Sequence, residues 1–140
     1  MIGLVMGVPT LREIFDDKYY ADLDGGILES FGRLFKNALK IYAYPQKDAK
    51  TGALVTAGNL RTAPHLRHLY EFMLENRFVE SIRDFDERCL SIYSRDALAR
   101  LRAGGTDWED MIPPEAVALI KRRQLLGYPG EYPTAVASGF

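Results

Sequence analysis

The segment GILESFGRLFKNAL, residues 26–39, most constrains the fold because its apolar side chains recur at helical intervals. Such spacing predicts an amphipathic helix whose apolar face packs against other elements. The charged and amide side chains fall on the remaining faces. The predicted apolar face contains Ile27, Leu28, Phe31, Leu34, Phe35 and Ala38, and the polar positions are Glu29, Arg33, Lys36 and Asn37.

Four further segments predict helices from their start and stop signals. Thr10 followed by Glu13 has the spacing of a capping box and favours a helix over about 11–20. A helix starting near Pro64 buries one apolar face and ends near Asn76. Ser94 as an N-cap and Gly104 as a stop enclose another helix, and a last one follows residues 113 and 114, both prolines.

The period changes from helical to alternating in LKIYAYPQKDAKTGALVT, residues 39–56. Tyrosines and β-branched residues on either side of a turn-rich centre predict a β-hairpin. FVESI, residues 78–82, predicts a short edge strand. The strand and helix alternation of a parallel α/β sheet is not evident, so we expect a mainly α, compact helical domain of about five helices with one β-hairpin, an α+β arrangement.

Length and apolar content favour one domain. A chain of 140 residues with 47% hydrophobic residues suffices for a single core. We expect this domain to cover residues 1–128, with the hairpin near 39–56. The Pro, Gly and Ser content of residues 129–140 predicts a flexible tail.

The charge balance bears on whether the protein binds nucleic acid, and the cysteine content bears on its cellular compartment. Eighteen basic and nineteen acidic residues give a formal net charge of -1, without the basic excess that favours nonspecific nucleic-acid binding. Cys89 is the only cysteine, which fits a reducing compartment. The first residues lack the pattern of a signal peptide, and no apolar run is long enough for a membrane span. We expect a cytoplasmic protein.

The candidate site is the basic start of the helix in TAPHLRHLYEFMLENR, residues 62–77. His65 and His68 are three residues apart and can share one helix face, but two histidines are only part of a metal site, so we assign no metal. With Arg61 and Arg67 they also suit an anion, because the N–H groups of a helix N-terminus favour phosphate. The simpler interpretation is that these side chains are solvated or paired with carboxylates such as Glu71.

Other reactive residue types have simpler explanations. Acidic residues such as Asp16 and Asp86 lie near predicted caps and turns, where carboxylates accept backbone N–H groups. Cys89 is typical of a small buried apolar residue. Tyrosines interleaved with lysines, such as Tyr42 near Lys40, resemble the surfaces of single-strand binders, but they more commonly pack their rings, so we do not expect a nucleic-acid partner.

Four stretches resemble a known family. These are LDGGILESFGRLFKNALKIYAYP, APHLRHLYEFMLEN, IYSRDALARL and IPPEAVALIKRRQLLGY, which together fall within residues 9–128. They are similar to a family of small bacterial proteins, many of them cyanobacterial, loosely associated with the name nicotinate-nucleotide adenylyltransferase. The resemblance implies that His65 and His68 correspond to the histidines of a His-x-Gly-His motif that stabilises phosphates. Arg67 stands where that motif has glycine, and no other catalytic position carries over.

Two functional hypotheses follow. The first is a nonenzymatic protein-interaction module of a bacterial cytosolic protein, which uses no cofactor. It docks on a protein partner or on its own copy through the hairpin and the helix end that carries the Arg and His residues. It rests on the lack of a complete catalytic constellation and on the many Tyr, Phe and Arg residues, which commonly anchor interfaces. The second is a small nucleotide- or phosphate-binding protein or enzyme centred on Arg61, His65, Arg67 and His68.

Overall fold

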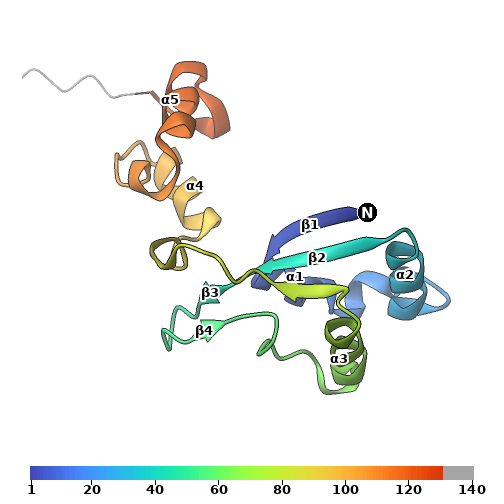
Figure 1. The fold of residues 1–140 in the computed structure, drawn as a ribbon. Helices are drawn as coiled ribbons and strands as arrows, with labels where there is room; N and C mark the ends of the chain where they lie inside the picture. The colour runs from blue at the N-terminus through green and yellow to red at the C-terminus, as the bar shows by residue number, and fades with distance from the viewer. Residues whose placement is uncertain (131–140) are drawn as a thin grey trace, which may run out of the picture. The chain divides into compact units, whose positions relative to one another are not determined.

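The computed structural model of the protein describes residues 1–130 (Figure 1). The chain divides into two compact units, Met1–Ser91 and Ile92–Phe140, and each has a buried core of its own. The single domain expected over residues 1–128 stays a prediction. Most of the tail expected at 129–140 lies outside the described residues.

The first unit combines three helices with two small sheets. A parallel sheet has the order β1-β2-β5, so β2 is its central strand. A two-stranded antiparallel hairpin joins β3 to β4. The strands are β1 (Ile2–Gly7), β2 (Leu39–Tyr44), β3 (Gln46–Lys47), β4 (Leu54–Val55) and β5 (Val79–Ser81), and the helices are α1 (Val8–Ile14), α2 (Gly26–Phe35) and α3 (Arg67–Glu75).

The parallel sheet follows from the helical segments between its strands. Parallel neighbours need a crossover connection, which α1 and α2 supply between β1 and β2, and α3 supplies between β2 and β5. Residues 2–7 were not predicted as a strand. These six uncharged residues lack the alternation of apolar and polar side chains that indicates one. The parallel pairing of β2 was not predicted either, whereas the short edge strand expected at 78–82 is confirmed as β5.

The hairpin lies inside the predicted range 39–56 but is shorter than expected. Gln46 pairs with Val55 and Lys47 with Leu54, whereas β2 pairs on both edges with other strands. The turn is organised by Asp48, whose carboxylate accepts the Thr51 N–H at 2.8 Å and the Lys50 N–H at 3.0 Å. These hydrogen bonds, led by that of the Thr51 backbone, hold the pKa of Asp48 below its ordinary value.

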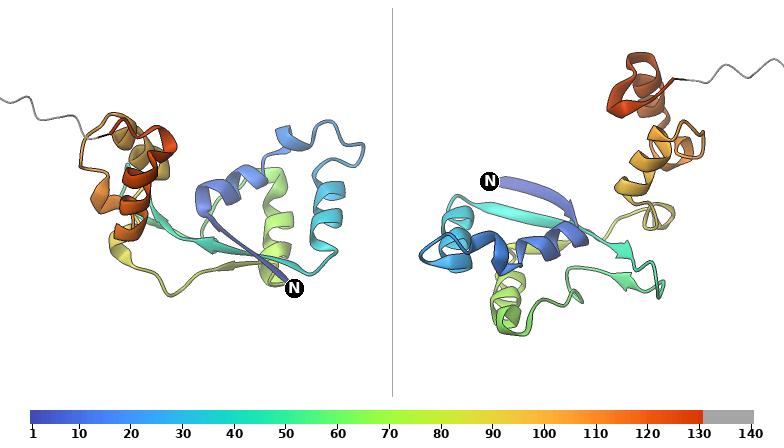
Figure 2. Two further views of the ribbon diagram at one scale, coloured as in Figure 1. Left: turned by 90° about the horizontal axis from the view of Figure 1, so that it is seen from above. Right: turned by 180° about the vertical axis from the view of Figure 1, so that it is seen from behind.

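One face of β2 carries the core of the first unit. Leu39, Ile41 and Ala43 alternate with half-buried residues along the strand, as expected for a sheet covered on one face. Helices α1, α2 and α3 lie beside the sheet (Figures 1 and 2). Leu11, Phe31, Tyr70 and other helix residues belong to the same core. Phe15 packs edge to face against Phe31 and against Tyr70, with ring centroids 4.9 and 4.8 Å apart.

The first helix differs from the sequence prediction at both ends. Helix α1 begins at Val8 directly after β1, with Gly7 as N-cap and Pro9 in its first turn, so Thr10 is not the cap. It ends at Ile14, and Asp17–Tyr20 form a separate 3₁₀ turn, η1, in place of a continuous helix to residue 20. Proline in the first turn is compatible with a helix start because its missing N–H has no intrahelical partner there.

The second unit is described over residues 92–130. It contains α4 (Ser94–Arg102) and α5 (Pro114–Arg123), which confirm the two predicted helices, although Tyr93 and not Ser94 is the N-cap of α4. Their core consists of Leu101, Trp108, Ile120 and Tyr128.

Trp108 is held in the core of the second unit by two contacts. Its Nε1–H donates to the Gly105 carbonyl oxygen at 2.9 Å, and its ring centroid lies 5.8 Å from that of Tyr128. The indole is therefore buried with its polar atom hydrogen-bonded.

The helices, the hairpin and the small sheet confirm the α+β arrangement of about five helices. Within residues 1–130, every helix is too short or too polar to cross a lipid bilayer.

Candidate functional site

Three of the four residues of the predicted anion site lie at the start of α3. Arg61 lies in the preceding loop, His65 in the 3₁₀ turn η2 (Pro64–Leu66), and Arg67 and His68 are the first residues of α3. All four are exposed; the side chains of His65 and His68 are 64% and 78% accessible. The structure thus places His65, Arg67 and His68 at one helix end on the surface, and Arg61 in the exposed loop before it.

The two histidines have different carboxylate partners. His65 Nε2 contacts the Asp17 carboxylate of η1, and His68 Nδ1 lies 2.9 Å from the Glu71 carboxylate one turn along α3. Arg67 lies beside His68, with 3.2 Å between its Nη2 and the His68 Nε2. An anion at this helix end would therefore compete with Asp17 and Glu71 for the same side chains.

Other candidate chemical groups lie where caps and turns place them. Asp16 accepts the Lys18 N–H of η1, and Asp86 accepts the Arg88 N–H of the turn η3 (Glu87–Cys89), which confirms the capping interpretation of these carboxylates. The hydrogen bonds of the Arg88 side chain lower the pKa of Asp86 to about 2. Among residues 1–130, no three histidine, cysteine or acidic side chains are grouped closely enough to hold a metal ion.

The expectation that Cys89 is buried is wrong. The thiol belongs to the exposed turn η3, because the apolar residue that fills the adjacent buried position is Leu90. The neighbouring Leu in the RCLSI segment, and not the cysteine, therefore provides the packing contact.

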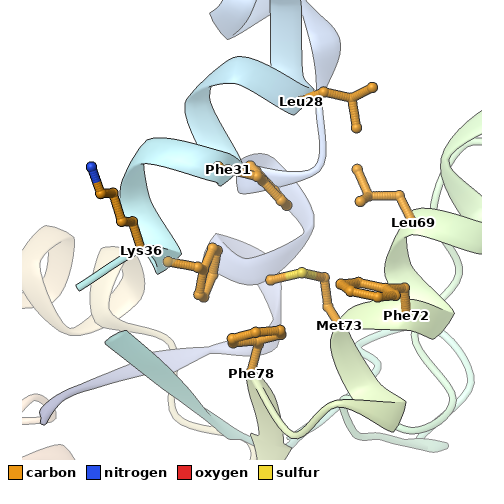
Figure 3. Close-up of a pocket in the computed structure, with 9 residues that line it drawn as sticks. Leu28, Phe31, Lys36, Leu69, Phe72, Met73 and Phe78 are labelled. Carbon is orange, nitrogen blue, oxygen red and sulfur yellow. The ribbon is translucent and has the colours of Figure 1, made fainter. Parts of the chain in front are cut away.

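An apolar groove lies between α2 and α3, and none of the four predicted anion-site residues is part of its lining (Figure 3). Its volume is about 340 Å³. Phe78, which precedes β5, also borders it. The lining consists of Leu28, Phe31, Gly32, Phe35 and Lys36 from α2, Leu69, Phe72 and Met73 from α3, and Phe78.

Each helix contributes one longitudinal stripe to this α2–α3 groove. The α2 residues recur at intervals of three and four, as do Leu69, Phe72 and Met73 of α3, so their side chains share the facing sides of the two helices. Leu28 and Leu69 point toward one another across the groove (Figure 3). Gly32 keeps the middle of the α2 stripe open, since a Cβ at this position would meet no atom within 4 Å.

Large apolar surfaces of the groove are open to solvent. Leu28 is 66% accessible and Phe72 is 52% accessible, although Phe72 stacks on Phe78 with a centroid distance of 6.2 Å. Among the described residues that line the groove, Lys36 alone is charged, and its amine points away from the apolar side chains (Figure 3).

Sequence reasoning assigned these helix faces to the core and missed the groove. The available signal was Gly32, a glycine inside the apolar stripe of a helix. A glycine there leaves space where the stripe would otherwise be filled.

Comparisons with known proteins give no relative. The chain matches no protein-family model, no curated protein and no solved structure. The adenylyltransferase resemblance stays a prediction.

Proposed function

We propose that the protein is a nonenzymatic interaction module of the bacterial cytosol that binds an amphipathic helix of a protein partner in the α2–α3 groove. The observation that carries the proposal is an apolar groove whose rim residues Leu28 and Phe72 are largely exposed. Exposed apolar side chains gathered around a concave surface are typical of interaction sites. The cytosolic assignment rests on the lone, exposed Cys89.

The shape of the groove favours a helix as the occupant. Two neighbouring helices with facing apolar stripes can accept a third, which inserts side chains spaced three and four residues apart. The open position at Gly32 gives such a side chain a place to enter. Because Lys36 is the charged residue of the lining, an acidic residue at the matching end of the partner helix complements the groove.

The alternative function, nucleotide or phosphate binding, has less support. It would use the helix end with His65, Arg67 and His68, whose exposed side chains already contact Asp17 and Glu71. Binding there would replace existing contacts in a solvated position, where charge interactions are weak.

Filling the groove tests the proposal. Gly32→Leu places a side chain in open space, and Gly32→Ala is the matched control that barely reduces the volume. The probe is a fluorescently labelled amphipathic helical peptide with leucines on one face and glutamates on the other, and its anisotropy reports binding. We expect binding to the unchanged protein and to Gly32→Ala, and a loss of about tenfold or more in affinity for Gly32→Leu.

Two results would count against the proposal. One is equal peptide affinity in both Gly32 variants, and the other is the absence of binding to the unchanged protein. A thermal-shift screen with nucleotides covers the alternative: a stabilisation that His68→Ala abolishes would favour a phosphate site. Circular dichroism establishes that each variant is folded.

A further inference from the structure

Strand β1 leaves one edge of the parallel sheet open. It is the first strand in the order β1-β2-β5, and within residues 1–130 it pairs on one side only. The Ile2 N–H donates to the Ala38 carbonyl oxygen at 3.1 Å, toward β2. Because backbone groups alternate in direction along a strand, the N–H and C=O groups of Gly3 and Val5 point to the outer edge.

The outer edge of β1 has none of the features that usually keep such an edge unpaired. Its sequence, IGLVMG, contains no charged residue and no proline, and it pairs with β2 in an unbroken register from Ile2 to Gly7. Natural sheets protect edges with lysine, proline or bulges. Val5 is 69% exposed, and Ile2 and Leu4 are exposed as well. This edge offers unpaired backbone donors and acceptors flanked by apolar side chains. Another uncharged strand could pair with it.

We propose that this strand is β1 of a second copy of the chain, paired antiparallel across a twofold axis with Leu4 opposite Leu4. In this register Gly3 of each copy lies opposite Val5 of the other. Gly3 and Val5 are the residues whose backbone groups point outward, so both become hydrogen-bonded pairs, while the central Leu4 pair is the close, non-hydrogen-bonded type.

In this register the side chains of β1 in one copy fit against those of β1 in the other copy. Ile2, Leu4 and Met6 share the face of the sheet that carries Ile41, and pairing sets Ile2 against Met6 of the other copy. On the opposite face each Val5 meets Gly3, which has no side chain. The Tyr42 ring lies over this glycine, with Cε2 3.2 Å from the position of a Cβ, so it offers an apolar surface to the incoming Val5.

Charge does not oppose the pairing of two copies. Identical strands repel when charged residues lie opposite one another, and β1 contributes no charge to the pairing. A single strand pair buries little surface, so we expect a weak dimer whose population rises with protein concentration. The edge is separate from the α2–α3 groove, and this inference does not depend on the proposed function.

Analytical ultracentrifugation of the full chain, expressed without an N-terminal tag, tests the proposal. We expect a concentration-dependent monomer–dimer equilibrium for the unchanged protein and a monomer for Val5→Lys, which introduces like charges at an exposed position. Leu28→Lys is the matched control: it adds the same charge at an equally exposed leucine of the groove and leaves the dimer intact. A monomeric unchanged protein, or dimeric Val5→Lys, would overturn the proposal.

Cysteine cross-linking tests the register. In a Cys89→Ser background, Leu4→Cys brings two thiols together across the twofold axis, because residues in a non-hydrogen-bonded pair have Cα atoms about 4.5 Å apart. Ile2→Cys places each thiol opposite Met6. We expect a covalent dimer on mild oxidation of Leu4→Cys and little from Ile2→Cys, with circular dichroism to establish folding. Equal cross-linking of the two variants would refute the pairing of Leu4 with Leu4.

Discussion

At the scale of single residues, Tyr70 links helix α3 to the loop beyond the hairpin. Its ring is buried against Phe15, and its hydroxyl donates to the Ala57 carbonyl oxygen at 2.6 Å. Burial raises the pKa of Tyr70, so the hydroxyl stays protonated and keeps donating across the usual pH range.

Removal of the Tyr70 hydroxyl should destabilise the first unit. Tyr70→Phe keeps the ring but leaves the Ala57 carbonyl without this donor, so we expect a loss of about 1–2 kcal/mol in the free energy of unfolding. Tyr20→Phe is the control, because the Tyr20 hydroxyl donates to Ile14 in a less buried place and should cost less. Urea titration followed by circular dichroism measures both, and equal losses would contradict the role of burial.

Glu80 predicts a pH dependence of stability. Its carboxylate lies 2.8 Å from the Lys40 amine on β2 and 2.7 Å from Arg77, and these hydrogen bonds, Lys40 first, lower its pKa. A carboxyl whose pKa is lowered by folding stabilises the native state above its unfolded pKa. That contribution is lost as the pH falls through the lower folded value.

Replacement of Glu80 isolates this effect. We expect Glu80→Gln to reduce stability near neutral pH, and the difference from the unchanged protein to shrink as the pH falls below the ordinary glutamate pKa of about 4.3. The measurement is the urea midpoint of both proteins over a pH series. A difference that stays constant down to the lowest pH would show that the ion pairs contribute nothing.

At the scale of elements, the start of α2 and its connection to β2 each contain a residue with a left-handed backbone. Gly26, the first residue of the helix, has φ +56°, and Ala38, between the helix and β2, has φ +55°. Glycine adopts this conformation without cost, whereas a residue with a Cβ is strained there. The backbone is thus relaxed at Gly26 and strained at Ala38.

Exchange of residue type at these two positions should have opposite effects. We expect Ala38→Gly to raise the free energy of unfolding by about 0.5–1 kcal/mol and Gly26→Ala to lower it by about 1 kcal/mol. A Cβ at Gly26 meets no atom within 4 Å, so the second change measures backbone strain and not a steric clash. Denaturant titrations compare the two variants, and a change of the same sign in both would disprove the explanation.

At the scale of the whole molecule, the two units have separate cores of unequal size. Among the described residues the first core buries thirteen side chains and the second four. Stability rises with the apolar surface that a core buries. We therefore expect the second unit to unfold at lower denaturant than the first.

The single tryptophan allows this expectation to be measured. Trp108 lies in the second core, so its fluorescence follows that unit, while far-ultraviolet circular dichroism follows the whole chain. Leu11→Ala leaves a cavity in the first core and should cost about 2–5 kcal/mol there. We expect the tryptophan transition to stay unchanged. A parallel shift of both signals would instead support the single cooperative domain expected over residues 1–128.

The local pattern of residues determined most of the elements. Helical spacing and helix signals located α2, α3, α4 and α5, and capping residue types placed Asp16 and Asp86 beside turns. These features depend on neighbours within a few positions along the chain, where side chains and backbone are close in any conformation.

Only the tertiary structure decided which strands pair and which apolar side chains remain exposed. The partners of β2 lie on segments distant in sequence, and Leu28 and Phe72 are open because α2 and α3 leave a groove between them. The sequence spacing of apolar residues along a helix is the same whether or not another element covers them. Its exposure depends on the packing of elements that sequence spacing does not specify.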